Sequence, residues 1–88
     1  MAERSVQILN KNGLHARPAA EIVKLLARFQ SDVTISRDGT DVNGKSIMGV
    51  MMLAAECGST LLLRAEGGDA DEALDALSLL IQNKFGER

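Results

Sequence analysis

The stretch VTISRDGTDVN, residues 33–43, decides the fold class, because it contains a complete hairpin. Val33 and Ile35 alternate with polar residues, as in a strand that has one buried face. Asp38-Gly39 is a strong turn signal, since glycine adopts a positive φ without steric cost. We therefore predict a strand over residues 33–36 and a short strand over residues 40–43, paired antiparallel.

Outward from this hairpin, residues 5–9 and 61–66 are predicted to form two more strands. Helical patterns cover residues 16–29, 47–53 and 70–84. Ser46 can cap the second of these helices. Asp69 and Glu72 resemble a capping box at the start of the third, and Gly86 can end it. The first and third helices each have an apolar stripe: Ala19, Ile22, Val23, Leu26 and Phe29, then Leu74, Leu77, Ile81 and Phe85.

The resulting order is β-α-β-β-α-β-α within one domain of 88 residues. A hairpin requires antiparallel pairing, and polar residues alternate with apolar ones along the strands. The fold class is therefore α+β: an open-faced two-layer β-sandwich, with a four-stranded antiparallel sheet and three helices on one face. Strand order does not follow from this pattern, and a ferredoxin-like order and others fit equally well.

Composition disfavours several functions. A net charge of −2 and two aromatic residues argue against a nucleic-acid partner, which needs a basic surface and stacking side chains. No apolar stretch is long enough for membrane insertion, and no signal peptide precedes the first strand. Cys57 is alone, so we expect a reduced, cytoplasmic protein in which this thiol is partly buried. Without metal-ligand spacings or nucleotide motifs, no cofactor and no metal are expected.

The segment GLHARPAA, residues 13–20, contains the only histidine, His15. It lies where a turn becomes a helix, and the first backbone N–H groups of a helix have no internal partner. The N–H groups of Ala16 and Arg17 therefore offer a phosphate-binding site. Pro18 stiffens this first turn without loss of a hydrogen bond. The Arg17 guanidinium supplies donors that match phosphate oxygens.

Histidine titrates near neutral pH, so its neutral ring is available there as a nucleophile. The positive helix end and Arg17 favour that neutral form and would stabilise a phosphoryl group after transfer. His15 is therefore a candidate phosphoryl acceptor. In the competing interpretation, His15 is a helix cap and Arg17 a solvated charge. The residues alone leave both open.

A second segment of interest begins at Ser46. As an N-cap it would be structural, but a phosphate at a helix N-terminus is also stabilised, so Ser46 is a candidate regulatory phosphosite. Ile47, Met48 and Met51 follow it. They are either core residues or an adaptable surface that binds several partners, since a helix this short cannot bury every side.

The run GLHARPA resembles the active-site signature of the HPr family, the histidine phosphocarriers of the phosphoenolpyruvate-dependent sugar phosphotransferase system. The resemblance extends over essentially the whole chain. It implies an open-faced β-sandwich and a carrier rather than an enzyme. It further implies that Enzyme I phosphorylates His15 at Nδ1, that Arg17 stabilises the phosphate, and that an EIIA domain receives the group.

The same resemblance implies that Ile47, Met48 and Met51 face Enzyme I and EIIA, and that Ser46 is a target of a serine kinase/phosphatase. Because both partners would dock on one face, we expect a monomer. Gly44 and the run Met52-Leu53-Ala54 depart from common sugar-branch sequences. They leave open a nitrogen- or regulation-linked branch. A non-catalytic module acting through Ser46 and a small-molecule-binding ferredoxin-like domain are further alternatives.

Overall fold

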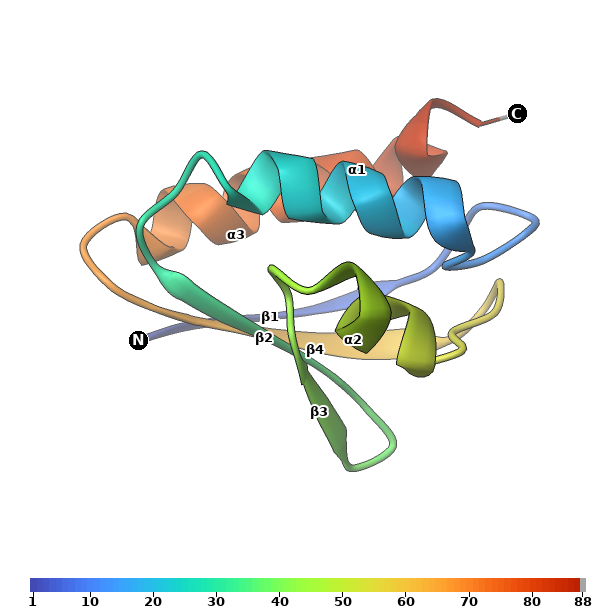
Figure 1. The fold of residues 1–88 in the computed structure, drawn as a ribbon, viewed down its shortest axis with the longest axis horizontal. Helices are drawn as coiled ribbons and strands as arrows, with labels where there is room; N and C mark the ends of the chain where they lie inside the picture. Colours follow the sequence, from blue (N-terminus) through green and yellow to red (C-terminus); the bar gives the residue numbers. More distant parts are fainter. Residues whose placement is uncertain (88) are drawn as a thin grey trace.

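The structure is a computed structural model and describes residues 1–87. The helices and strands follow one another in the order β-α-β-β-α-β-α, which confirms the predicted order, and a short 3-10 helix comes last. Figure 1 shows how they are arranged. They are β1 (Ala2–Gln7), α1 (Ala16–Leu26), β2 (Asp32–Arg37), β3 (Thr40–Asn43), α2 (Ile47–Met52), β4 (Thr60–Glu66), α3 (Ala70–Gln82) and η1 (Lys84–Gly86).

The four strands form one sheet in the order β1-β4-β2-β3, and every neighbouring pair is antiparallel. The predicted hairpin is present, with Arg37 opposite Thr40. In the centre of the sheet, Ile35 of β2 lies opposite Leu63 of β4. Since β1 is an edge strand, the ferredoxin-like order, in which the first strand lies inside the sheet, is ruled out.

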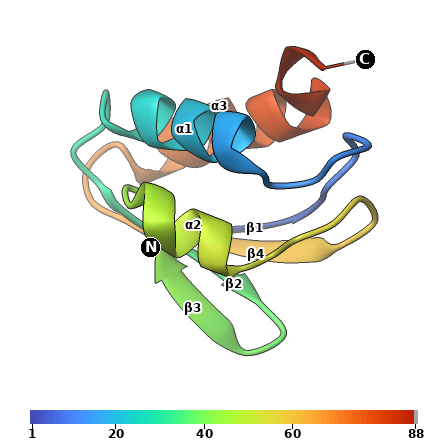
Figure 2. The ribbon, with the colours of Figure 1, turned by 45° about the vertical axis from the view of Figure 1, so that its right-hand side comes forward.

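The three helices lie on one face of the sheet and leave the other face open, as predicted (Figures 1 and 2). The core lies between the layers, because every second residue of β4 points toward the helices and is buried. All four apolar side chains of the stripe predicted for the last helix, up to Phe85 in η1, are buried. In the stripe predicted for the first helix, Val23 and Phe29 are only partly buried. Within the helical layer, α1 packs beside α3, so that the start of α1 lies next to the end of α3 (Figure 1).

Element bounds differ from the predictions by a few residues. The first strand begins at Ala2 and ends at Gln7, because β4 is long enough to pair with all six residues. The first helix ends at Leu26, three residues before the predicted Phe29. The last helix ends at Gln82, two residues before Lys84, and the chain turns there into η1.

Asp69 does not cap α3 with its side chain, so the capping-box prediction is wrong. Its carboxylate instead accepts hydrogen bonds of 2.9 Å from the backbone N–H groups of Gln30 and Ser31, and one from the Ser31 hydroxyl. These bonds tie the start of α3 to the loop before β2. The expectation for Cys57 is also wrong, because its side chain is exposed in the loop before β4.

Candidate functional site

His15 is the N-cap residue of α1. Its backbone is extended, with φ −80° and ψ −171°, and its carbonyl oxygen accepts the N–H of Ala19 at 3.1 Å. Its side chain makes no cap hydrogen bond, so the interpretation of the imidazole as a helix cap is wrong. With 42% of its side chain exposed, His15 is accessible to a partner.

The first turn of α1 presents the predicted anion-binding groups. The N–H groups of Ala16 and Arg17 have no partner within the helix, and they lie at the positive end of its dipole. Pro18 is buried and has no N–H to satisfy. The Arg17 side chain stays about half exposed beside His15. The predicted acceptor and phosphate-binding groups therefore lie together.

The loop before α1 is held by a buried amide. Asn10 is 1% exposed, and its side-chain nitrogen donates to the carbonyl oxygen of Gly13 at 2.8 Å. Gly13 has φ +66°, and its N–H donates back to the carbonyl of Asn10 at 3.2 Å. This tight turn sets the path of the chain into His15.

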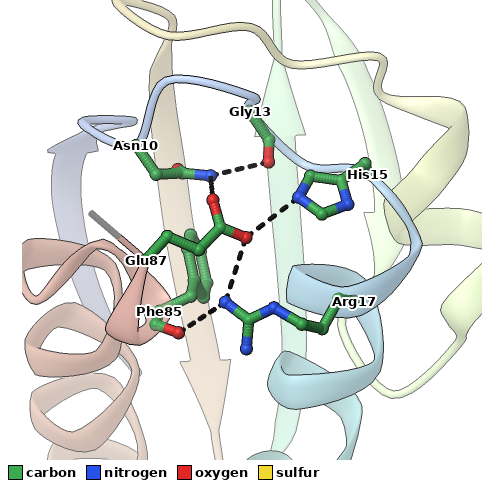
Figure 3. A network of polar contacts seen from close by, with 6 residues as sticks. All are labelled: Asn10, Gly13, His15, Arg17, Phe85 and Glu87. Carbon is green, nitrogen blue, oxygen red and sulfur yellow. Dashed lines mark hydrogen bonds and ion pairs between the residues drawn. The ribbon is translucent and has the colours of Figure 1, made fainter.

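The end of the chain completes the site (Figure 3). Lys84 and Phe85 both have positive φ, so the chain reverses after α3 while the Phe85 side chain enters the core. The carbonyl oxygen of Phe85 accepts from Arg17 Nη2 at 2.7 Å. Glu87 then places its carboxylate between His15 and Arg17, and its side chain is only 15% exposed.

Both carboxylate oxygens of Glu87 are used. Oε2 lies 2.9 Å from His15 Nε2 and 3.0 Å from Arg17 Nη2, while Oε1 accepts from Asn10 Nδ2 at 3.0 Å. The hydrogen bond from Asn10 is the largest cause that lowers the pKa of Glu87, followed by those from Arg17 and His15, while partial burial opposes them. Glu87 therefore remains ionised at neutral pH.

Sequence reasoning missed Glu87. It stands 72 residues from His15, and only the reversal at Lys84 and Phe85 brings it to the site. No local pattern predicts that two non-glycine residues adopt positive φ in succession. The Gly86 signal indicated an end of the helix but not the direction that the chain takes afterwards.

The second predicted segment forms α2, which packs beside α1 (Figure 2). Ser46 Oγ accepts the N–H of Gly49 at 3.1 Å, which confirms the predicted cap. Val50 supplies the buried contact of this helix. The other apolar side chains are exposed, among them Ile47, Met48 and Met51, and Met48 is 72% exposed. The interpretation of these three residues as core is therefore wrong.

Comparison with known proteins identifies the chain. The family model "PTS HPr component phosphorylation site" matches residues 2–83. Phosphocarrier protein HPr of Cupriavidus necator is 54% identical over 99% of this chain and 98% of its own length. HPr of Treponema pallidum is 53% identical over 99% of each. A crystal structure of HPr from Thermoanaerobacter tengcongensis superposes with a TM-score of 0.96 at 48% identity, covering 100% of this chain and 99% of the other.

Fold and relatives together define a small histidine phosphocarrier, a component that is phosphorylated on histidine and is not itself an enzyme. The chain belongs to the HPr family of the phosphotransferase system, which implies Enzyme I and EIIA as its partners. HPr-like protein Crh of Bacillus subtilis is also related, at 45% identity over 96% of this chain and 99% of its own. Over residues 1–87, no helix has the length and apolar character needed to cross a membrane.

Proposed function

We propose that His15 is the phosphoryl acceptor of this carrier, and that it takes the group at Nδ1 from phosphorylated Enzyme I. The observation that carries this proposal is the position of the chain's one histidine, exposed at the N-terminus of α1 with Arg17 beside it. An EIIA domain of the sugar branch would then receive the group. Such a carrier would work in the cytoplasm.

The roles of the neighbouring groups follow from charge. A phosphoryl group on His15 carries negative charge, and the N–H groups of Ala16 and Arg17 can donate to its oxygens. The Arg17 guanidinium adds charge-assisted hydrogen bonds. Arg17 now donates to Phe85 and Glu87 through one terminal nitrogen, Nη2. Its remaining N–H groups are available for a phosphoryl oxygen.

We also propose that Ile47, Met48 and Met51 form the docking surface for Enzyme I and EIIA. These exposed apolar side chains lie on α2, which packs beside the helix that begins at His15. A partner that reaches the histidine would therefore cover them and remove them from water. Because both partners need this one face, the working form would be a monomer, although solved structures of relatives include dimers of HPr and Crh.

Ser46 is the candidate regulatory site, and a serine kinase/phosphatase would be its partner. Its hydroxyl sits at the N-cap of α2 and directly precedes the docking surface. A phosphate there would add about two negative charges beside apolar side chains that must be desolvated on docking. Phosphorylation of Ser46 would therefore weaken binding of Enzyme I without unfolding the helix.

Gly44 is one of the departures that raised a nitrogen- or regulation-linked branch. A Cβ at this position would lie 2.9 Å from a methyl carbon of Leu26 and 3.2 Å from the carbonyl oxygen of Val33. Glycine here therefore has a local packing reason. This reason favours neither branch, and the sugar branch remains the function proposed.

The proposal is tested with purified Enzyme I and phosphoenolpyruvate, by following intact mass. The wild type should gain one acid-labile phosphoryl group, and so should Ser46→Ala, whereas His15→Ala should gain none. Uptake by His15→Ala would place the acceptor elsewhere. No uptake by a folded wild type, with an Enzyme I shown to phosphorylate itself, would refute the carrier role for this donor.

A further inference from the structure

We propose that Glu87 is a positioning residue for phosphoryl transfer: it holds His15 in the tautomer that carries its proton on Nε2, so that Nδ1 presents the free lone pair. This inference rests on the proposed function, because it explains how His15 offers one ring nitrogen and not the other. It assigns a role to a residue outside the segment that surrounds the histidine.

The geometry sets the tautomer. Glu87 Oε2 lies 2.9 Å from His15 Nε2, a hydrogen-bond distance. An ionised carboxylate can only accept, so the proton of this bond must belong to Nε2. A neutral imidazole has one N–H, and Nδ1 is then the unprotonated nitrogen. Transfer at Nδ1 therefore needs no prior proton movement on the ring.

Glu87 is itself held in place by groups from other parts of the fold. Asn10, which is buried, donates to Oε1, and Arg17 donates to Oε2. Arg17 is anchored in turn by the carbonyl oxygen of Phe85 (Figure 3). The carboxylate is thus oriented before any partner arrives, as positioning of a histidine requires.

The transfer step gives Glu87 a second effect. The Nδ1 lone pair attacks the phosphorus of phosphorylated Enzyme I and forms the new N–P bond, while the bond from phosphorus to the donor atom breaks and leaves its electron pair on the donor. The ring keeps its Nε2 proton and acquires a positive charge. The Glu87 carboxylate stabilises that charge, as the aspartate of a Ser-His-Asp triad stabilises an imidazolium.

Two variants separate these effects. Glu87→Ala loses the acceptor and the charge. Glu87→Gln keeps an amide oxygen that can accept from Nε2 but loses the charge. Glu3→Gln is the matched control, because Glu3 is exposed on β1. Backbone amide spectra and urea unfolding establish that each variant is folded.

The first readout is the ¹⁵N chemical shifts and long-range couplings of the His15 ring in the free proteins. The wild type, Glu87→Gln and Glu3→Gln should be mainly Nε2-protonated, and Glu87→Ala should be a mixture of tautomers. The second readout is the initial rate of phosphorylation by Enzyme I. Glu87→Ala should be about tenfold slower, the effect of losing one charge-assisted hydrogen bond, and Glu87→Gln should be intermediate.

An unchanged tautomer ratio in Glu87→Ala would overturn the positioning role, and so would a Glu87→Ala rate equal to that of the wild type. A wild type that accepts no phosphoryl group would instead refute the proposed function. The tautomer measurement needs no Enzyme I, so the two failures are distinguishable.

Discussion

The backbone N–H of Leu14 donates a 2.9 Å hydrogen bond to the carbonyl oxygen of Ala55, and this bond joins the loop before α1 to the loop after α2. The approach is possible because Gly13 has no Cβ. A Cβ at this position would clash with the carbonyl oxygen of Ala55, because it would lie well inside van der Waals distance. Gly13 also has φ +66°, which a residue with a side chain rarely adopts. The direction in which the chain enters His15 therefore depends on a residue without a side chain.

Gly13→Ala should lower the free energy of unfolding by about 3 kcal/mol, because strain at positive φ and a backbone clash add together. The measurement is urea unfolding. Gly39→Ala is the control, since Gly39 also has a positive φ, of +84°, but has open space where a Cβ would lie, and it should lose about 1 to 2 kcal/mol. Equal losses in the two variants would show that the Ala55 contact is unimportant.

Arg17→Ala should slow phosphorylation of His15 by about tenfold or more, because a charge-assisted contact to the phosphoryl oxygens is lost. Arg17→Lys should recover only part of the rate, since an ammonium cannot reproduce the planar fork of donors. The rate with Enzyme I is measured by intact mass. Arg28→Ala, an exposed arginine just beyond α1, should behave as the wild type; a comparable loss there would indicate a general charge effect.

Much of the fold was predictable because it depends on local periodicity. The hairpin at Asp38-Gly39, the α3 stripe and the Ser46 cap each arise from neighbours in the sequence, and all are present. Strand order was not predictable, since several orders bury the same alternating faces. Asp69 shows the limit of prediction from local pattern. Its spacing to Glu72 resembles a capping box, but its carboxylate accepts hydrogen bonds from a loop that is 38 residues away in the sequence.

The candidate site divides in the same way. His15, Arg17 and the N–H groups between them lie within one turn of helix, so the run of residues was enough to bring them together. Asn10 and Glu87 meet only in the folded protein, because they are 77 residues apart in the sequence. Two residues with positive φ turn the chain so that Glu87 reaches the amide of Asn10. No local pattern in the sequence predicts this contact.

Asp69 should make stability depend on pH at the acid end. Its pKa lies below the ordinary 3.8, mainly because of the Ser31 hydroxyl, with help from the N–H groups of Gln30 and Ser31. A carboxyl whose pKa is lower in the folded state stabilises above the unfolded pKa, and that contribution is lost as pH falls through the folded value.

Asp69→Asn should therefore be less stable than the wild type at neutral pH, and the difference should shrink below about pH 3.8. Urea midpoints between pH 2.5 and pH 7 test this, with Asp71→Asn as the control from the same helix start. A constant difference across that range would mean that the Asp69 contacts are not selective for the ionised form.

Met48→Asp should leave stability unchanged but raise the KM of Enzyme I for this protein several-fold, because an exposed apolar contact is replaced by a charge that must be desolvated. Leu79→Asp is the matched control: Leu79 is 58% exposed and lies on α3. Steady-state phosphorylation by Enzyme I at varied concentrations of this protein gives kcat and KM. Equal effects of the two substitutions would contradict a docking surface on α2.

Ser46→Ala should cost about 1 kcal/mol of unfolding free energy, because the N–H of Gly49 loses its acceptor. Ser46→Asp should keep the cap and its stability, since aspartate is an equally good N-cap residue, yet slow phosphorylation by Enzyme I. Urea unfolding and the intact-mass rate separate these effects. A Ser46→Asp rate equal to that of Ser46→Ala would argue against regulation by charge at this position.

The hydrogen bond from Asn10 to Glu87 joins residues 77 positions apart, nearly the whole length of the chain. During synthesis, His15 emerges from the ribosome before Glu87, the residue that contacts its ring. On the role proposed for Glu87, the imidazole of a nascent chain has no tautomeric control until the turn that carries Glu87 has docked. A chain that has not yet reached Glu87 would therefore present His15 with a mixture of tautomers.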